Sequence, residues 1–142
     1  MQISRKAHYA LRATVILAGL PPGKSMQAQE LATQGSIPIK FLEQILLVLK
    51  RAGILQSKRG VGGGYRLDKE ARHIRVADVL EAIDGELCRL GDETGVPSFP
   101  GADGLGRFLH QTEARVNALL GETTIDELLD SADGEAILGH GI

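Results

Sequence analysis

The residues best suited to chemistry form a basic, glycine-rich segment over 58–66, in which Lys58 and Arg59 precede three consecutive glycines. Glycines let a hairpin turn tightly and approach another molecule closely. An arginine at such a tip could enter a DNA minor groove and sense its width. A nucleotide-binding loop is excluded, because no Gly-Lys-Ser/Thr follows the glycines and the segment precedes a strand. A solvated hairpin is the plain alternative. The predicted DNA-contacting residues of this wing are Lys58, Arg59, Gly62, Gly63 and Tyr65.

A second set of polar side chains lies in a helical pattern over 39–51. Leu42, Ile45, Leu46 and Leu49 repeat at helical spacing and should hold this helix on the core, which leaves its polar face outward. A helix in the major groove could contact bases, since glutamine pairs with adenine and glutamate accepts from the cytosine amino group. An ordinary solvated face is the alternative. The predicted DNA-contacting residues of this helix are Lys40, Glu43, Gln44, Lys50 and Arg51.

The elements that must position these residues follow from hydrophobic spacing and from helix-ending residues. Ser4 is expected to cap the first helix and Ser25 the second. Helices are predicted over 4–20, 26–34, 39–51 and 74–83, and strands over 54–57 and 65–67. Two helices joined by a tight turn and followed by a basic hairpin are the layout of a winged helix-turn-helix.

The remaining sequence predicts a loop and a dimerisation helix. Glycine and proline are frequent over 84–106, which indicates a loop of sensor type. A helix is expected over 105–120, with an apolar stripe wide enough for a partner helix from a second subunit. Thr124 should begin a last short helix, and the tail after Asp130 is expected to be loosely ordered. The predicted dimer contacts are Leu105, Phe108, Leu109, Thr112, Val116 and Leu119.

Charge separates the two halves of the 142-residue chain. Its net charge of −2 combines 13 Lys and Arg against four acids over 1–75, or +9, with three against 14 over 76–142, or −11. A basic half can bind DNA phosphates by releasing counterions. The acidic half is better suited to dimerisation, sensing or contact with a protein partner. One cysteine excludes a disulfide within the chain, and no apolar run could cross a bilayer, so we expect a soluble, cytoplasmic protein without membrane association.

Three motifs stand out together: FLEQ at 41–44, LKRAGIL at 49–55 and RGVGGGY at 59–65. In combination they resemble the IscR/NsrR/CymR-type family of bacterial winged-helix transcription regulators. The resemblance extends over nearly the whole chain, through ADVLEAI at 77–83 and TIDEL at 124–128. It implies a homodimer paired through the long helix near the C-terminus, bound to a pseudo-palindromic promoter site. It also implies that Glu43 tunes base preference and that Arg59 reaches the minor groove.

The chain differs from the iron–sulfur members of this family in its cysteines. Iron–sulfur members carry three cysteines in the loop before the dimerisation helix, where this chain has only Cys88. A cluster needs four ligands, mostly thiolates, so we expect no cofactor and no metal. The alternative is a [2Fe–2S] cluster across the dimer. Its ligands would be Cys88 with non-thiol residues, because some relatives supply a ligand from the first helix of the other subunit. The candidate non-thiol ligands are His8, Glu86, Asp92 and His110.

Two further hypotheses for Cys88 remain open: a small buried apolar side chain and a redox-sensing thiol. Taken together, the sequence predicts a mainly α protein with a small β-hairpin wing. Its divisions are a winged helix-turn-helix over 1–83, a Gly/Pro-rich loop over 84–106, and a dimerisation helix and tail over 107–142. The predicted function is a DNA-binding transcription regulator, expected to be a repressor. The alternatives are a redox- or cluster-responsive sensor and a regulator acting through a protein partner. No nucleophile–base pair or metal-ligand spacing indicates an enzyme.

Overall fold

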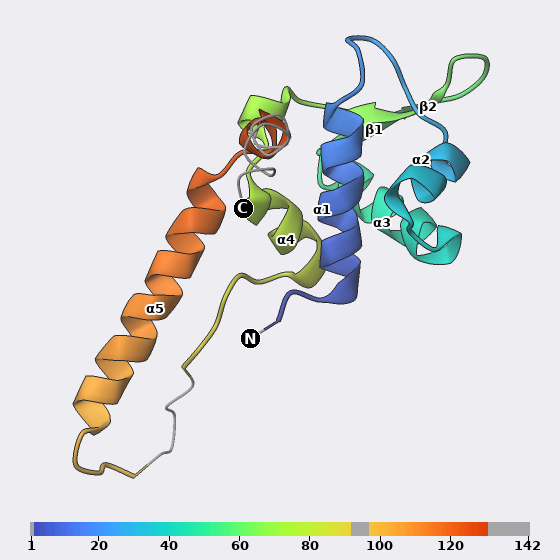
Figure 1. Ribbon diagram of the computed structural model, residues 1–142. Helices are drawn as coiled ribbons and strands as arrows, with labels where there is room; N and C mark the ends of the chain where they lie inside the picture. The colour runs from blue at the N-terminus through green and yellow to red at the C-terminus, as the bar shows by residue number, and fades with distance from the viewer. Residues whose placement is uncertain (1, 92–96, 131–142) are drawn as a thin grey trace, which may run out of the picture.

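The computed structural model describes residues 2–91 and 97–130. Helices α1–α4 and a two-stranded antiparallel hairpin form one body, and α5 projects from it as an arm (Figure 1). This mainly helical architecture with a hairpin wing confirms the predicted fold class. The elements are α1 (Arg5–Ala18), α2 (Ala28–Gly35), α3 (Ile39–Arg51), β1 (Leu55–Lys58), β2 (Gly64–Leu67), the 3-10 turn η1 (Ala71–His73), α4 (Val76–Asp84) and α5 (Ala102–Glu122).

Helix α1 is the central element, with α3 and α4 packed against it. Ser4 caps it as predicted, because its Oγ accepts the backbone N–H of Ala7 at 3.1 Å. The helix buries Ala7, Ala10 and Ala13 completely, and side chains this small let neighbouring helices approach closely. The predicted burial of the apolar residues of α3 is confirmed, since Leu42, Ile45, Leu46 and Leu49 are each at most 1% exposed.

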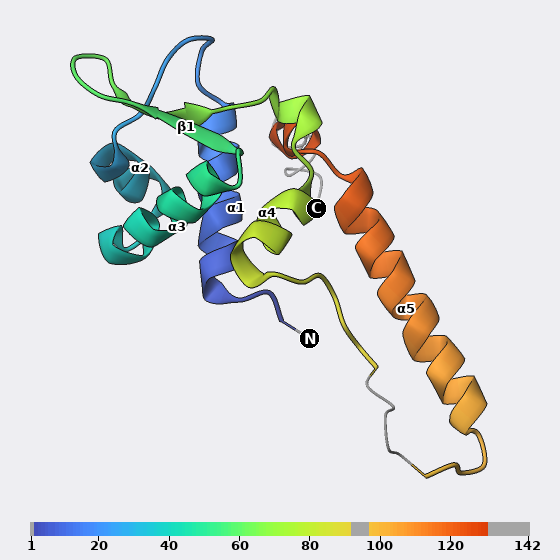
Figure 2. The ribbon, with the colours of Figure 1, turned by 180° about the vertical axis from the view of Figure 1, so that it is seen from behind.

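The chain after α5 returns to the core. Thr124 pairs with Arg75 in an isolated β-bridge, and Ile125 is fully buried in the same core as α3. Thr124 Oγ1 accepts the backbone N–H of Glu127 at 3.2 Å, and residues 125–130 are helical, which confirms the predicted cap. The tail predicted to be loosely ordered lies outside the described residues. Since this return fixes only the C-terminal end of α5, the rest of the helix extends away from the body (Figure 2).

Three predicted helix starts were wrong. Helix α4 begins at Val76 instead of residue 74, because Ile74 has an extended backbone and its carbonyl oxygen accepts the backbone N–H of Ile125. Ser25 does not cap the second helix, which begins at Ala28 with Gln27 as its N-cap residue. The backbone of Met26 instead pairs with Tyr65 of β2, so the helix cannot begin earlier. Helix α5 begins at Ala102 instead of residue 105, so the predicted loop ends earlier. Glycine spacing misplaced this boundary because the first turns of α5 tolerate glycines, at a cost of about 1 kcal/mol each.

The predicted dimer stripe of α5 divides into two parts. Three of its apolar side chains are exposed: Leu105 at 48%, Phe108 at 62% and Leu119 at 64%. Leu109, Thr112 and Val116 are half-buried, and Val116 lines a cavity against the body. No residue of α5 is fully buried, although the helix has 21 residues. Within the described part of the chain, no helix is both long and apolar enough to cross a bilayer.

Candidate nucleic-acid interface

One face of α3 is free for an external partner. Because its four core residues fix the rotation of the helix, the predicted DNA-contacting residues turn outward. All of them are exposed: Lys40, Glu43, Gln44, Lys50 and Arg51. Leu47 lies among them and is 49% exposed. A half-exposed leucine on a polar face offers an apolar contact, such as the methyl group of thymine, beside the hydrogen-bonding groups. Leu47 was not among the residues predicted to contact DNA.

The wing presents its basic residues at the end of the hairpin. The strands pair from Leu55 with Leu67 to Lys58 with Gly64, so the tip comprises residues 59–63. Lys58, Arg59 and Gly62 are exposed, and Tyr65 is half-buried. Gly63, predicted to contact DNA, is instead buried. A Cβ there would lie 2.3 Å from the Lys58 carbonyl oxygen, so this glycine shapes the turn.

A clamp formed by Met26 and Gln27, immediately before α2, fixes the wing relative to the helices. The backbones of Met26 and Tyr65 exchange two hydrogen bonds, of 2.9 and 2.8 Å. Gln27 Nε2 also donates to the Gly63 carbonyl oxygen at 3.0 Å. Gly64 makes this approach possible, because its φ is +129° and a Cβ would lie 2.4 Å from the Met26 carbonyl oxygen. Met26, Gln27 and Gly64 were all missed by the sequence analysis, since nothing in their spacing indicates a contact.

The end of α3 and the wing surround one groove of about 390 Å³. Lys50 of α3 faces it together with Lys58 and Arg59 of the hairpin, and Gln27 and Tyr65 complete the wall. Three cations around one groove suit a phosphate backbone, because they would replace its condensed counterions. Arg66 is held elsewhere: its guanidinium donates to Gln56 Oε1 at 3.3 Å and to the Gly23 carbonyl oxygen at 3.4 Å.

An ion pair caps α4, the last helix of this body before the arm. Arg75 and Asp78 bond at 2.8 Å, and the Arg75 backbone N–H donates to Asp78 Oδ2 at 2.9 Å. Burial acts to raise the pKa of Asp78, but the hydrogen bonds and charge of Arg75 outweigh it and lower the pKa below 3.8. The same hydrogen bond raises the pKa of Arg75. The Asp78 carboxylate thus remains charged at the N-terminus of α4, where the helix dipole favours an anion.

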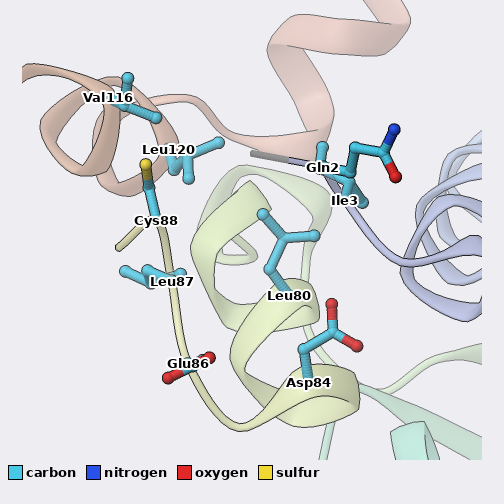
Figure 3. A pocket seen from close by; sticks show the side chains of 9 residues that line it. All are labelled: Gln2, Ile3, Leu80, Asp84, Glu86, Leu87, Cys88, Val116 and Leu120. Atoms are coloured by element: carbon cyan, nitrogen blue, oxygen red, sulfur yellow. The ribbon is translucent and has the colours of Figure 1, made fainter. Parts of the chain in front are cut away.

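Cys88 lies between the body and α5. Its backbone N–H donates to Asn117 Oδ1 at 2.9 Å, and Asn117 Nδ2 donates back to its carbonyl oxygen at 3.0 Å. Its half-buried side chain lines a cavity with Val116 and Leu120 of α5 (Figure 3).

The candidate cluster ligands do not gather around Cys88 within one chain. His8 lines a different groove, on α1, and His110 lines a third, beside Gly91. Glu86 does share the Cys88 cavity. Asp92 lies outside the described residues. Among those that are described, no three His, Cys, Asp or Glu side chains form a group able to hold a metal. A [2Fe–2S] cluster needs four ligands, so the described residues of one chain do not fit it.

The comparison with known proteins decides the family. The model of the Rrf2 family, described as an iron-dependent transcriptional regulator, matches residues 3–131. The chain belongs to the Rrf2 family. Rrf2 proteins are DNA-binding transcription regulators and not enzymes, which confirms both predictions. The resemblance to IscR and CymR inferred from the three motifs is confirmed by the relatives that follow.

The relatives match over most of their length. A helix-turn-helix transcriptional regulator of Mycobacterium tuberculosis is 35% identical over 135 residues, covering 93% of this chain and 83% of the relative. IscR of Cereibacter sphaeroides is 29% identical over 137 residues, covering 91% and 87%. Among solved structures, CymR, the global cysteine regulator of B. subtilis, superposes with a TM-score of 0.79 at 25% identity, covering 92% and 98%. T. potens IscR, at 24% identity and a TM-score of 0.71, shares the fold.

Proposed function

We propose that this Rrf2 protein is a cytoplasmic homodimer that represses transcription by binding a pseudo-palindromic promoter site. The observation that carries the proposal is the cationic groove between the exposed face of α3 and the clamped wing. Each subunit would place one α3 in the major groove and one wing beside it. Bound across a promoter, such a dimer would obstruct RNA polymerase.

Within each half-site, the exposed residues divide by chemistry. Gln44 suits adenine, and Glu43 suits a cytosine amino group. A carboxylate facing DNA is unfavourable without such a donor, so Glu43 would exclude wrong sequences more than it adds affinity. Arg59 at the exposed tip would enter the minor groove. The phosphate contacts would come from Lys40, Lys50, Arg51 and Lys58.

The dimer would form through the arm. Leu105, Phe108 and Leu119 leave an apolar strip exposed on a helix that has no fully buried residue. A strip of this kind is normally covered by a partner. A second copy of α5 offers the same strip, and a two-fold axis would then place two α3 helices at the spacing of two half-sites.

We further propose that the protein works without an iron–sulfur cluster, because the described residues of one chain do not supply its ligands. The absorbance spectrum and iron content of protein purified without oxygen test this point. A colourless, iron-free protein that binds DNA agrees with the proposal. A visible band with stoichiometric iron and sulfide would contradict it, and would indicate ligands contributed across the dimer.

The experiment that tests the proposal starts from duplexes selected by the protein from random DNA. A footprint and the sedimentation mass of the complex are then measured on the best duplex. We expect two symmetric half-sites and two chains per duplex. Phe108→Glu should yield a monomer that binds one half-site weakly. A wild-type protein that binds as a monomer to an asymmetric site would contradict the dimer proposal.

A further inference from the structure

We propose that the cavity beside Cys88 is an effector site for a small apolar molecule that carries a positive charge. This inference rests on the proposed function, since an effector would act by changing how the dimer holds DNA. The cavity lies where α4, α5 and the segment before α1 meet (Figure 3). It is separate from the DNA-contacting groove.

The cavity has the size and lining of a small-molecule site. It holds about 300 Å³, at the lower end of the range of ligand pockets. Leu80 of α4 is 4% exposed and belongs to a second hydrophobic cluster, which the cavity borders. Val116 and Leu120 of α5 form the facing wall, and Leu87 closes the side formed by the loop. An apolar molecule in this space would remove these side chains from water.

The negative charge at the rim of the cavity favours a ligand with a positive charge. Of the described residues that line the cavity, two are carboxylates, Asp84 and Glu86, and none is Lys or Arg. Asp84 is oriented by Ser4, whose Oγ donates to Asp84 Oδ1 at 2.6 Å. Arg89 approaches Glu86 only to 3.8 Å, and both side chains are mostly exposed. An ammonium group at the mouth would therefore be attracted, and a carboxylate of the same shape would be repelled.

The cavity lies between the DNA-binding body and the arm, so a ligand bound there could affect DNA binding. One wall belongs to α4, which packs on α1 in the DNA-binding body, and the other belongs to α5, which would carry the dimer contacts. Asn117 ties the loop at Cys88 to α5 through two hydrogen bonds. A ligand between the walls would change how α5 packs on α4 and hence the distance between the two α3 helices. Such a ligand shifts DNA affinity only if it binds the two arrangements unequally.

The test uses two probes of matched shape and opposite charge. Calorimetry of the full chain without DNA compares 4-phenylbutylamine with 4-phenylbutyrate. We expect the amine to bind about tenfold more tightly, since each exposed charge pair contributes a few-fold at most. Asp84→Asn with Glu86→Gln should abolish the preference, whereas Asp103→Asn with Glu122→Gln, the same charge change elsewhere, should preserve it. Equal affinity for both probes in the wild type would overturn the proposal.

A cavity-filling variant tests whether the probes bind in this cavity and not on an exposed apolar surface elsewhere on the protein. Val116→Phe should abolish binding of both probes, and Ala114→Phe, which adds the same ring at an exposed position of α5, should leave it intact. The amine should then change the affinity of the wild type, but not of Val116→Phe, for the selected duplex. Amine binding that survives Val116→Phe, or that leaves DNA affinity unmoved, would overturn the effector assignment. DNA binding without the amine is measured in the same titration, so a failure of the proposed function is seen separately.

Discussion

Replacing Gly64 by alanine should detach the wing while leaving the helical core intact. The added Cβ would lie 2.4 Å from the Met26 carbonyl oxygen and 2.5 Å from its carbon, both backbone atoms that cannot rotate away. The hairpin would have to move off Met26, and the two hydrogen bonds between Met26 and Tyr65 would be lost. The wing would then no longer be held beside α3.

The size of the effect follows from these contacts. Losing two backbone hydrogen bonds costs about 1–3 kcal/mol in all, and an alanine held at a φ normally restricted to glycine costs about 1–3 kcal/mol. We therefore expect Gly64→Ala to lower the free energy of unfolding by about 2–6 kcal/mol, which most of the range of about 5–15 kcal/mol for a folded domain can absorb. Gly62→Ala is the matched control, because Gly62 has a φ of +74° but open space around its Cβ position.

Urea unfolding followed by circular dichroism measures both variants. Gly62→Ala should lose only the cost of its positive φ, about 1–2 kcal/mol. Gly64→Ala should lose more, and its affinity for DNA should fall toward that of Arg59→Ala. Equal unfolding midpoints for the two variants would refute the clamp, because the contact with Met26 would then contribute nothing.

Three further predictions concern single side chains. Glu43→Ala should relax base choice at one position of the selected site with little loss of affinity; a uniform loss for all sequences would contradict its role as a filter. If Leu47 contacts a thymine methyl, replacing that thymine by deoxyuridine should weaken the wild type and leave Leu47→Ala unchanged, whereas equal losses in both proteins would exclude the contact. Because Asp78 has a lowered pKa, its stabilising contribution is present above pH 3.8 and disappears as the pH falls through the folded-state pKa. The unfolding free energies of the wild type and Asp78→Asn should accordingly converge in acid, and a constant difference would contradict the ion pair with Arg75.

The predictable part of the fold rests on local spacing. The four apolar residues of α3 follow the helical period, so their burial and the outward face of the helix could both be predicted. The hairpin could be predicted because glycines accept the positive φ values that a tight turn between two short strands requires, as Gly60 and Gly62 do here. Thr124 could be predicted as a cap, because capping depends on residues three positions apart.

The missed features depend on contacts between residues far apart in the sequence. The backbone of Met26 pairs with Tyr65, and no side-chain pattern at Met26 encodes that pairing. Gln27 is an ordinary polar residue until the fold brings Gly63 within 3.0 Å of its amide. The cavity beside Cys88 likewise requires α4 and α5 to be placed side by side. The predicted dimer stripe could not be divided into an exposed strip and a cavity wall without knowing how α5 rests on the body.

The measurement that tests the DNA-binding account most directly is the salt dependence of affinity for one selected duplex. It compares the wild type with Arg59→Ala at the wing tip and with Arg107→Ala on the exposed surface of α5. The account predicts that Arg59→Ala binds more weakly and reduces the slope of log affinity against log salt by about one unit. Arg107→Ala should keep the wild-type slope. Equal slopes for all three proteins would contradict the account, because the charge of Arg59 at the wing tip would then not lie against the DNA.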